Sequence, residues 1–177
     1  MKDTVEIEQK FRVENHETYF DKLKSTVAFG MPTLEVDIYY QHPSKDYSQT
    51  DELLKVRNWR EITYKGPKMD ANCKVRSEYT WMPEYPELLL ETLGFIKLLE
   101  IHKNRITGKF SLIKNNQAFS VTVALDKIAN LGNFIEIEIV TDKTNISSAI
   151  QCIEELAQEI GLHNIETKNY FELLFKK

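Results

Sequence analysis

Val5-Glu6-Ile7-Glu8-Gln9-Lys10-Phe11, near the start of the chain, decides the fold together with its late counterpart Ile135-Glu136-Ile137-Glu138-Ile139. Both stretches alternate apolar and charged residues with a period of two, which predicts β-strands whose acids share one face. Two carboxylates at positions i and i+2 of a strand lie about 7 Å apart and repel each other. Two such pairs predict a face that gathers cations, either Lys and Arg side chains or Mg²⁺ or Mn²⁺, which prefer carboxylate oxygen.

Length, composition and net charge limit the class of protein and the kinds of partner that this charged face could have. The chain has 177 residues, of which 42% are hydrophobic and 28% charged, as in a soluble globular protein, and we expect a single domain over residues 1–177. A net charge of -4 implies no general attraction to nucleic acid or to an anionic membrane. Cys73 and Cys152 fit no metal spacing and predict two reduced thiols. With no signal peptide and no apolar run of transmembrane length, we expect a cytoplasmic protein without a membrane partner.

Turn signals and periodicity divide the remaining chain into about eight strands and three or four helices. The alternating or β-rich stretches predict strands at 4–13, 35–41, 53–60, 61–65, 73–81, 109–113, 118–125 and 134–140, with a further strand that carries Lys103 and Arg105. Apolar stripes and capping residues predict a helix of about 12–14 residues after Asn15, and further helices near 87–93, 146–160 and 167–175.

Five of the strands alternate apolar residues with charges of both signs. For any one strand, a polar face turned to water is an adequate explanation. Taken together, one face would collect Glu6, Glu8, Lys10, Arg12, Lys55, Arg57, Lys74, Arg76, Glu78, Lys103, Arg105, Glu136 and Glu138. A closed antiparallel barrel of about eight strands can hold such side chains or one small ligand inside, with the helices packed outside.

A charged interior is costly unless its charges compensate one another or a ligand completes them. A polyanion with bound divalent metal fits, because basic side chains grip phosphate oxygens and carboxylates hold the metal.

Several short motifs, in order from residue 5 to 174, resemble those of one known family. Glu6-Ile7-Glu8-Gln9-Lys10 matches ExExK, Leu54-Lys55-Val56-Arg57 resembles LRxR, and Tyr64-Lys65-Gly66-Pro67 resembles YKGP. The later blocks are Arg76-Ser77-Glu78, Lys103-Asn104-Arg105, Leu125-Asp126, Leu131-Gly132-Asn133-Phe134-Ile135-Glu136-Ile137-Glu138 and Tyr170-Phe171-Glu172-Leu173-Leu174. The set is similar to the CYTH family, the triphosphate tunnel enzymes.

The resemblance implies a fold and a set of roles. The fold is α+β, a closed antiparallel eight-stranded β-barrel with a charged interior. Glu6, Glu8, Glu136 and Glu138 would hold Mg²⁺ or Mn²⁺. Triphosphate would be gripped by Lys10, Lys55, Arg57, Lys65, Arg76, Lys103 and Arg105. Lys10, Lys65 and Asp126 are the expected catalytic residues, with Asp126 near the metal or orienting a basic neighbour. Lys55 stands where the family more often has Arg, so a bidentate grip is lost there.

Two chemistries use this apparatus, and the tunnel residues do not separate them. The later motifs favour a class IV adenylate cyclase, which converts ATP to cyclic AMP and pyrophosphate. The alternative is a triphosphatase that hydrolyses inorganic tripolyphosphate, thiamine triphosphate or a nucleoside triphosphate. A third reading is a triphosphate-binding module without turnover. The expected partner is a small-molecule triphosphate, and a homodimer is the default assembly for a small enzyme.

Two further features bear on the ligand. Trp59 and Trp81 could stack on a base, although aromatic residues in strands more often pack. The polar loop 42–51 could cover the mouth of the tunnel.

Overall fold

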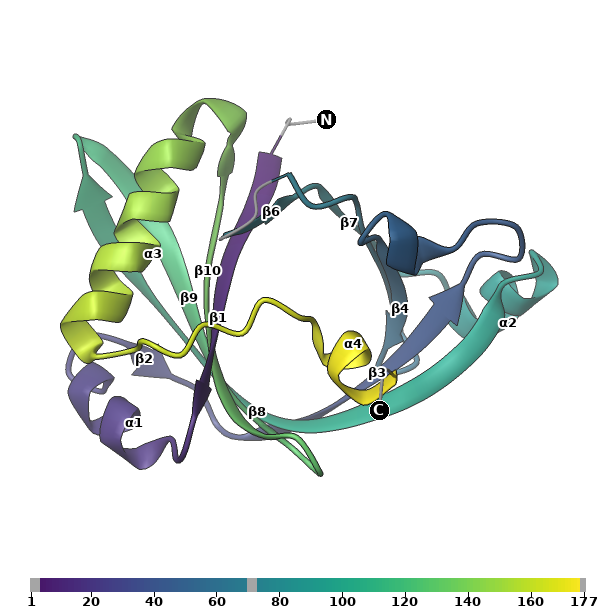
Figure 1. The fold of residues 1–177 in the computed structure, drawn as a ribbon, viewed down its shortest axis with the longest axis horizontal. Coiled ribbons are helices and arrows are strands. Elements are labelled where there is room, and N and C mark those ends of the chain that lie inside the picture. The colour runs from purple at the N-terminus through teal and green to yellow at the C-terminus, as the bar shows by residue number, and fades with distance from the viewer. Residues whose placement is uncertain (1–3, 70–72, 176–177) are drawn as a thin grey trace.

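The computed structural model describes residues 4–69 and 73–175 (Figure 1). Its strands are β1 (Thr4–Val13), β2 (Ala28–Phe29), β3 (Thr33–Gln41), β4 (Leu53–Arg57), β5 (Glu61–Lys65), β6 (Lys74–Arg76), β7 (Glu78–Trp81), β8 (Ile96–Lys114), β9 (Gln117–Ile128) and β10 (Gly132–Asp142). Its helices are α1 (Glu17–Leu23), α2 (Pro86–Thr92), α3 (Ile146–Ile160) and α4 (Tyr170–Phe175), with 3-10 turns η1 (Tyr47–Gln49) and η2 (Lys143–Asn145).

The strands form one antiparallel sheet in the order β6-β1-β10-β9-β8-β3-β4-β5-β7, with β2 paired to β8. The predicted closed eight-stranded barrel is wrong, because the described residues form ten strands and the edge strands β6 and β7 do not pair with each other. Ser77 alone separates these two edges in the chain, so one segment pairs with β1 through its first half and with β5 through its second. The sheet therefore curls into a ring of strands (Figure 1). The chain itself joins the two edges of this ring at Ser77, and no hydrogen bonds between β6 and β7 close it.

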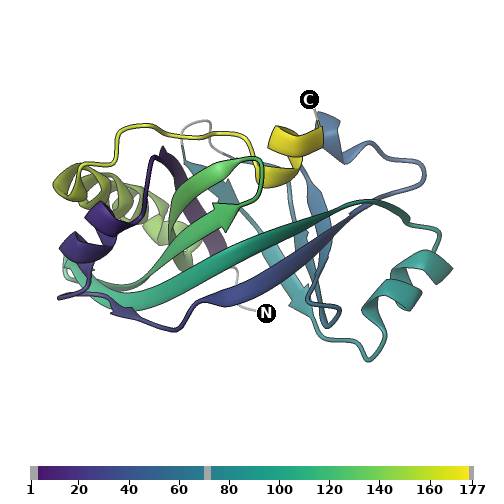
Figure 2. The same ribbon diagram turned by 90° about the horizontal axis from the view of Figure 1, so that it is seen from below.

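The convex face of the sheet carries the apolar residues of the alternating strands. Val5, Ile7 and Phe11 of β1 are buried in one cluster with Ile153 and Leu156 of α3. A second outer cluster joins β3, β4 and β5 to α2. Figure 2 shows α1 and α3 at one end of the molecule and α2 at the other. These three helices lie outside the sheet, as predicted.

Helix α4 departs from that prediction, because it packs on the concave face. Tyr170 is buried with Tyr39, Leu53, Ile101 and Phe134, each of which lies two positions from a charged residue of its strand and therefore on the same face. The inner face thus changes from charged to apolar toward one end, and α4 packs against the apolar part. Figure 1 shows α4 at the opening of the ring of strands. No helix among the described residues has the length and apolarity needed to span a bilayer.

Local sequence accounts for most boundaries. Asn115 and Asn116 both adopt positive φ, as a two-residue hairpin turn requires, and join β8 to β9. Gly161 ends α3 in the left-handed conformation at the predicted position. Helix α1 is shorter than predicted, because the chain leaves it at Lys24 and continues into β2.

Candidate active site

A cavity of about 90 Å³ lies on the charged part of the concave face. Its lining contains eight basic side chains, Lys10, Lys55, Arg57, Lys65, Lys74, Arg76, Lys103 and Arg105, and six carboxylates, Glu6, Glu8, Asp37, Glu78, Glu136 and Glu138. The structure therefore brings together every residue expected to bind metal or triphosphate. Asp126 and Arg12 are the exceptions among the charges singled out from the sequence, since neither lines the cavity. Arg12 instead pairs with Glu166 at 3.3 Å.

One side of the cavity is a group of acids around a single lysine. The Lys65 Nζ atom lies 2.6 Å from Glu6 Oε2, 2.9 Å from Glu78 Oε2 and 3.7 Å from Glu8 Oε2. These contacts raise the pKa of Lys65 well above its usual value in spite of burial, so its ammonium stays charged. Glu138 lies directly across the sheet from Glu8 and adds another carboxylate to the same group.

The pKa shifts of these acids reflect how closely the carboxylates are crowded together. Burial and the neighbouring carboxylates raise the pKa of Glu6 well above its usual value, and the same causes raise the pKa of Glu138. Burial also opposes ionisation of Glu8, but the ammonium groups of Lys74, Lys65 and Lys10 prevail and lower its pKa. Carboxylates that are buried and crowded in this way have the chemistry of ligands for a hard divalent ion.

The arrangement is nevertheless not a preformed metal site. Within residues 4–69 and 73–175, no three acidic, histidine or cysteine side chains converge closely enough to share one ion. The Lys65 ammonium lies among the acids instead. The donor set thus fits a divalent cation in chemical type, provided that Lys65 shifts away from Glu6.

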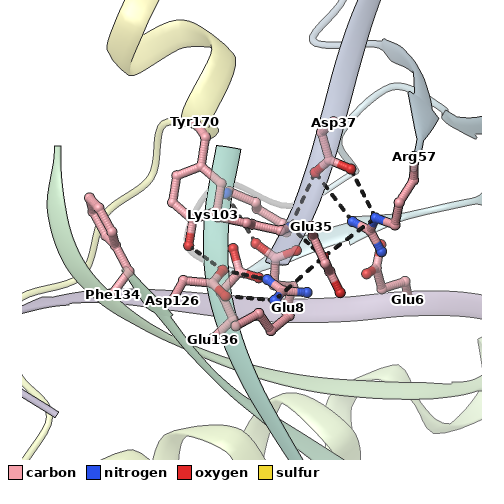
Figure 3. A network of polar contacts seen from close by, with 12 residues as sticks. Glu6, Glu8, Glu35, Asp37, Arg57, Lys103, Asp126, Phe134, Glu136 and Tyr170 are labelled. Carbon is pink, nitrogen blue, oxygen red and sulfur yellow. Dashed lines mark hydrogen bonds and ion pairs between the residues drawn. The ribbon is translucent and has the colours of Figure 1, made fainter. Parts of the chain in front are cut away.

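The opposite wall is organised around Asp37 of β3 (Figure 3). Its carboxylate accepts hydrogen bonds from Lys55 Nζ at 2.9 Å, Arg57 Nε at 2.8 Å and Lys103 Nζ at 3.1 Å. These cations outweigh burial and lower the pKa of Asp37 well below its usual value. Glu35, two residues earlier, lies 3.1 Å from Lys103 Nζ. Asp37 therefore fixes three of the seven side chains expected to grip triphosphate.

Asp126 supports the cavity from behind. It is fully buried, accepts a hydrogen bond from Arg105 Nε at 2.6 Å and accepts another from the Tyr170 hydroxyl at 2.9 Å (Figure 3). Arg105 also donates to Glu136. Of the two roles expected for Asp126, this geometry matches the orientation of a basic neighbour.

Lys10 and Arg76 complete the basic set. Burial and the nearby Lys74 ammonium lower the pKa of Lys10 to about 7, and its Nζ lies 4.1 Å from the centre of the Tyr170 ring. Arg76 donates to the backbone oxygen of Asp51 at 2.9 Å and to its carboxylate at 3.2 Å. The Nε atom of Arg76 is buried without a hydrogen-bond partner among the described residues, so this donor remains available to an anion.

Sequence reasoning missed part of the site. Glu35 and Asp37 show the same i, i+2 spacing of acids as Glu6 and Glu8, which was the available signal. Trp59 and Trp81 do not line the cavity. The apolar lining instead comes from Tyr39, Leu53 and Tyr170.

Comparison with known proteins adds a family to this geometry. A family profile described as "CYTH domain" matches residues 4–170. A protein of Methanocaldococcus jannaschii named "putative adenylate cyclase" is 28% identical over 96% of this chain and 98% of its own length. The solved structure of the PH1819 protein from Pyrococcus horikoshii is 36% identical, with a TM-score of 0.79 over 97% of this chain and 98% of that one.

A more distant structure shares the fold. It is titled a "putative adenylate cyclase" from Vibrio parahaemolyticus and is 24% identical, with a TM-score of 0.73 over 96% of this chain and 97% of that one.

Proposed function

This chain belongs to the CYTH domain family, and we propose that it is a metal-dependent enzyme acting on a triphosphate, most similar in activity to the class IV adenylate cyclases. The name carried by the Methanocaldococcus jannaschii relative supports the cyclase assignment over the other activities of such a site. The observation that carries the proposal is the convergence of eight basic side chains with six carboxylates in one internal cavity.

The roles follow from the contacts. Lys55, Arg57 and Lys103, held by Asp37, would bind the phosphate oxygens along one wall. Arg105, Arg76 and Lys10 would bind them from the other elements, with Arg105 oriented by Asp126. Because these cations are held in place before the substrate arrives, little reorganisation is needed when negative charge develops on the leaving group.

Glu6, Glu8, Glu136 and Glu138 are the proposed holders of Mg²⁺ or Mn²⁺. A divalent ion bound there would neutralise phosphate charge and polarise a phosphoryl oxygen. Lys65, which lies against Glu6 and Glu8, would then turn to the triphosphate. Lys10 and Lys65 are accordingly proposed to stabilise charge during the reaction.

In the cyclase reaction, the ribose 3′-oxygen of ATP forms a bond to the α-phosphorus and loses its proton. The bond from the α-phosphorus to the bridging oxygen breaks, and pyrophosphate leaves in line. The protein has to hold the triphosphate extended and to stabilise the departing pyrophosphate, which is the task that the basic walls of the cavity suit.

Hydrolysis is the second candidate, and one observation favours it. A cavity of about 230 Å³ adjoins the acidic side of the site and shares Glu6, Glu78 and Glu138 with it. Water from this side would reach a terminal phosphate. The same basic residues would serve either reaction.

Product analysis distinguishes these reactions. Purified protein is incubated with ATP, thiamine triphosphate or tripolyphosphate, each with Mg²⁺ and with Mn²⁺, and the products are separated by chromatography. The proposal expects cyclic AMP and pyrophosphate from ATP. ADP and phosphate as the sole products of ATP would refute the cyclase and support hydrolysis.

Variants test the site itself. Glu8→Ala and Lys65→Ala should abolish turnover, whereas Glu155→Ala and Lys109→Ala, which change exposed residues outside the cavity, should retain it. Near-normal rates for Glu8→Ala or Lys65→Ala would show that the site lies elsewhere.

A further inference from the structure

A second cavity adjoins the apolar end of the charged one. It measures about 210 Å³ and shares Tyr39, Leu53 and Asn169 with the charged cavity. The two volumes, about 90 and about 210 Å³, together approach the roughly 300 Å³ at which small-molecule sites begin. The shared wall means that a ligand anchored in the charged cavity could extend into the second one.

The lining of the second cavity differs in kind from that of the first. The aromatic residues that line it are Tyr39, Tyr40, Tyr47, Phe171 and Phe175, and its aliphatic side chains are Leu53, Leu54 and Leu98. The Tyr39 and Phe171 rings lie 5.3 Å apart at 30°, and the Phe171 and Phe175 rings are stacked at 4.7 Å. Such surfaces accept a flat aromatic group by stacking.

Each of the three carboxylates that line this cavity already has a partner within the protein. Asp51 pairs with Arg76, Glu52 pairs with Lys45, and Glu172 accepts a hydrogen bond from the backbone N–H of Asn169. The ion pair between Asp51 and Arg76 also connects the loop on one side of this cavity to a basic side chain that lines the charged cavity. The ligand group that fits here is therefore uncharged and aromatic.

The other side of the charged site does not suit an aromatic group. The cavity that adjoins it there is lined by Glu6, Glu78 and Glu138 with Thr4, Val5, Thr80 and Val140, and contains no aromatic ring. A substrate with a triphosphate at one end and a flat ring system at the other would thus have one orientation, with its ring system against α4.

We infer that the cavity between η1, β3 and α4 binds the aromatic organic group of the substrate, so that the enzyme acts on the triphosphate of a flat heterocycle rather than on inorganic tripolyphosphate. This inference rests on the proposed function. Helix α4 and the loop carrying Tyr47 and Asp51 would then select organic triphosphates over inorganic tripolyphosphate. Trp59 and Trp81 would have no part in this selection.

Two substitutions that narrow the cavity test the inference. Leu98→Trp fills the cavity from β8, and Ser48→Trp fills it from η1, at an exposed position where folding is not at risk. The matched controls are Leu89→Trp in an outer apolar groove and Ser44→Trp in the same loop as Ser48, because neither residue lines this cavity.

Binding of α,β-methylene-ATP and of tripolyphosphate is measured by calorimetry in the cold with Mg²⁺, so that the readout does not require turnover. Each narrowing variant should weaken binding of the nucleotide analogue at least tenfold and keep tripolyphosphate binding within twofold, while the controls change neither. If wild type binds both ligands and the narrowing variants leave their ratio unchanged, the inference is wrong and the proposed function stands. If wild type binds neither ligand, the proposed function itself fails.

Discussion

Asp37→Asn probes how the phosphate-binding wall is held together. The substitution keeps the size of the side chain and one hydrogen-bond acceptor but removes the negative charge shared by Lys55, Arg57 and Lys103. Asp37 is 1% exposed, so water cannot replace the lost charge. Three cations would then face one another with only Glu35 between them.

The size of the effect follows from the burial of the pair. Removing one partner of a buried ion pair costs about 3–5 kcal/mol. We take this value once rather than three times, because Lys103 and Arg57 retain their contacts with Glu35. For a protein of this size, the loss corresponds to a fall in Tm of about 6–20 °C.

The assay is thermal and urea unfolding of the ligand-free protein, with and without tripolyphosphate. Asp21→Asn is the control, because Asp21 forms an exposed pair with Lys24 and should cost less than about 0.5 kcal/mol. A bound polyanion supplies the missing negative charge, so tripolyphosphate should stabilise Asp37→Asn more than wild type.

Two results would contradict this reasoning. A stability loss below about 1 kcal/mol would mean that Asp37 is not the counter-charge that the distances indicate. Equal stabilisation of variant and wild type by tripolyphosphate would mean that the ligand does not use the cations bound to Asp37.

Three further predictions concern other parts of the cavity. Glu138→Gln should raise the Mg²⁺ or Mn²⁺ concentration needed for half-maximal turnover at least tenfold, and an unchanged titration would remove Glu138 from the metal site. Although burial opposes it, Lys65 lowers the pKa of Glu78 to about 2, so the stability contributed by Glu78 is complete above about pH 4.5 and is lost as the pH falls toward 2. Thermal unfolding across this range should be less pH-dependent for Glu78→Gln, whereas parallel curves would argue against the pair. Tyr170→Phe leaves buried Asp126 without one donor and should cost about 1–3 kcal/mol in urea unfolding, so an unchanged midpoint would contradict that contact.

The sequence alone predicts which residues of a strand lie on the inner face of the sheet and which lie on the outer face. Alternation placed Glu6, Glu8 and Lys10 on one face of β1 and Val5 and Ile7 on the other, and the structure confirms this division. A period of two survives any error in strand order, because residues at positions i and i+2 share a face of their strand whichever strand lies beside it. The expectation of an enclosed charged cavity could therefore be reached without knowledge of the topology.

The closure of the ring could not be predicted in the same way. Residues 73–81 keep their charged side chains in a period of two through Lys74, Arg76 and Glu78, yet the segment changes partners at Ser77 and forms two edge strands. Alternation reports which face a residue occupies and carries no information about which neighbour pairs with its backbone. The packing of α4 on the inner face was not predicted for a related reason. The apolar stripe that contains Tyr170 and Phe171 could pack equally well on either face of a sheet, so the sequence pattern does not say which face it covers.

Charge balance explains why so polar an interior can exist at all. The eight bases of the cavity face six carboxylates, and Glu35 and Asp126 add two more from behind the wall. The interior is thus formally neutral before any ligand enters, which limits the cost of burying it. A bare polyanion would upset that balance, whereas a triphosphate accompanied by divalent cations would preserve it. Metal and triphosphate binding are therefore coupled by the composition of the cavity, and each should increase the affinity for the other by the same factor.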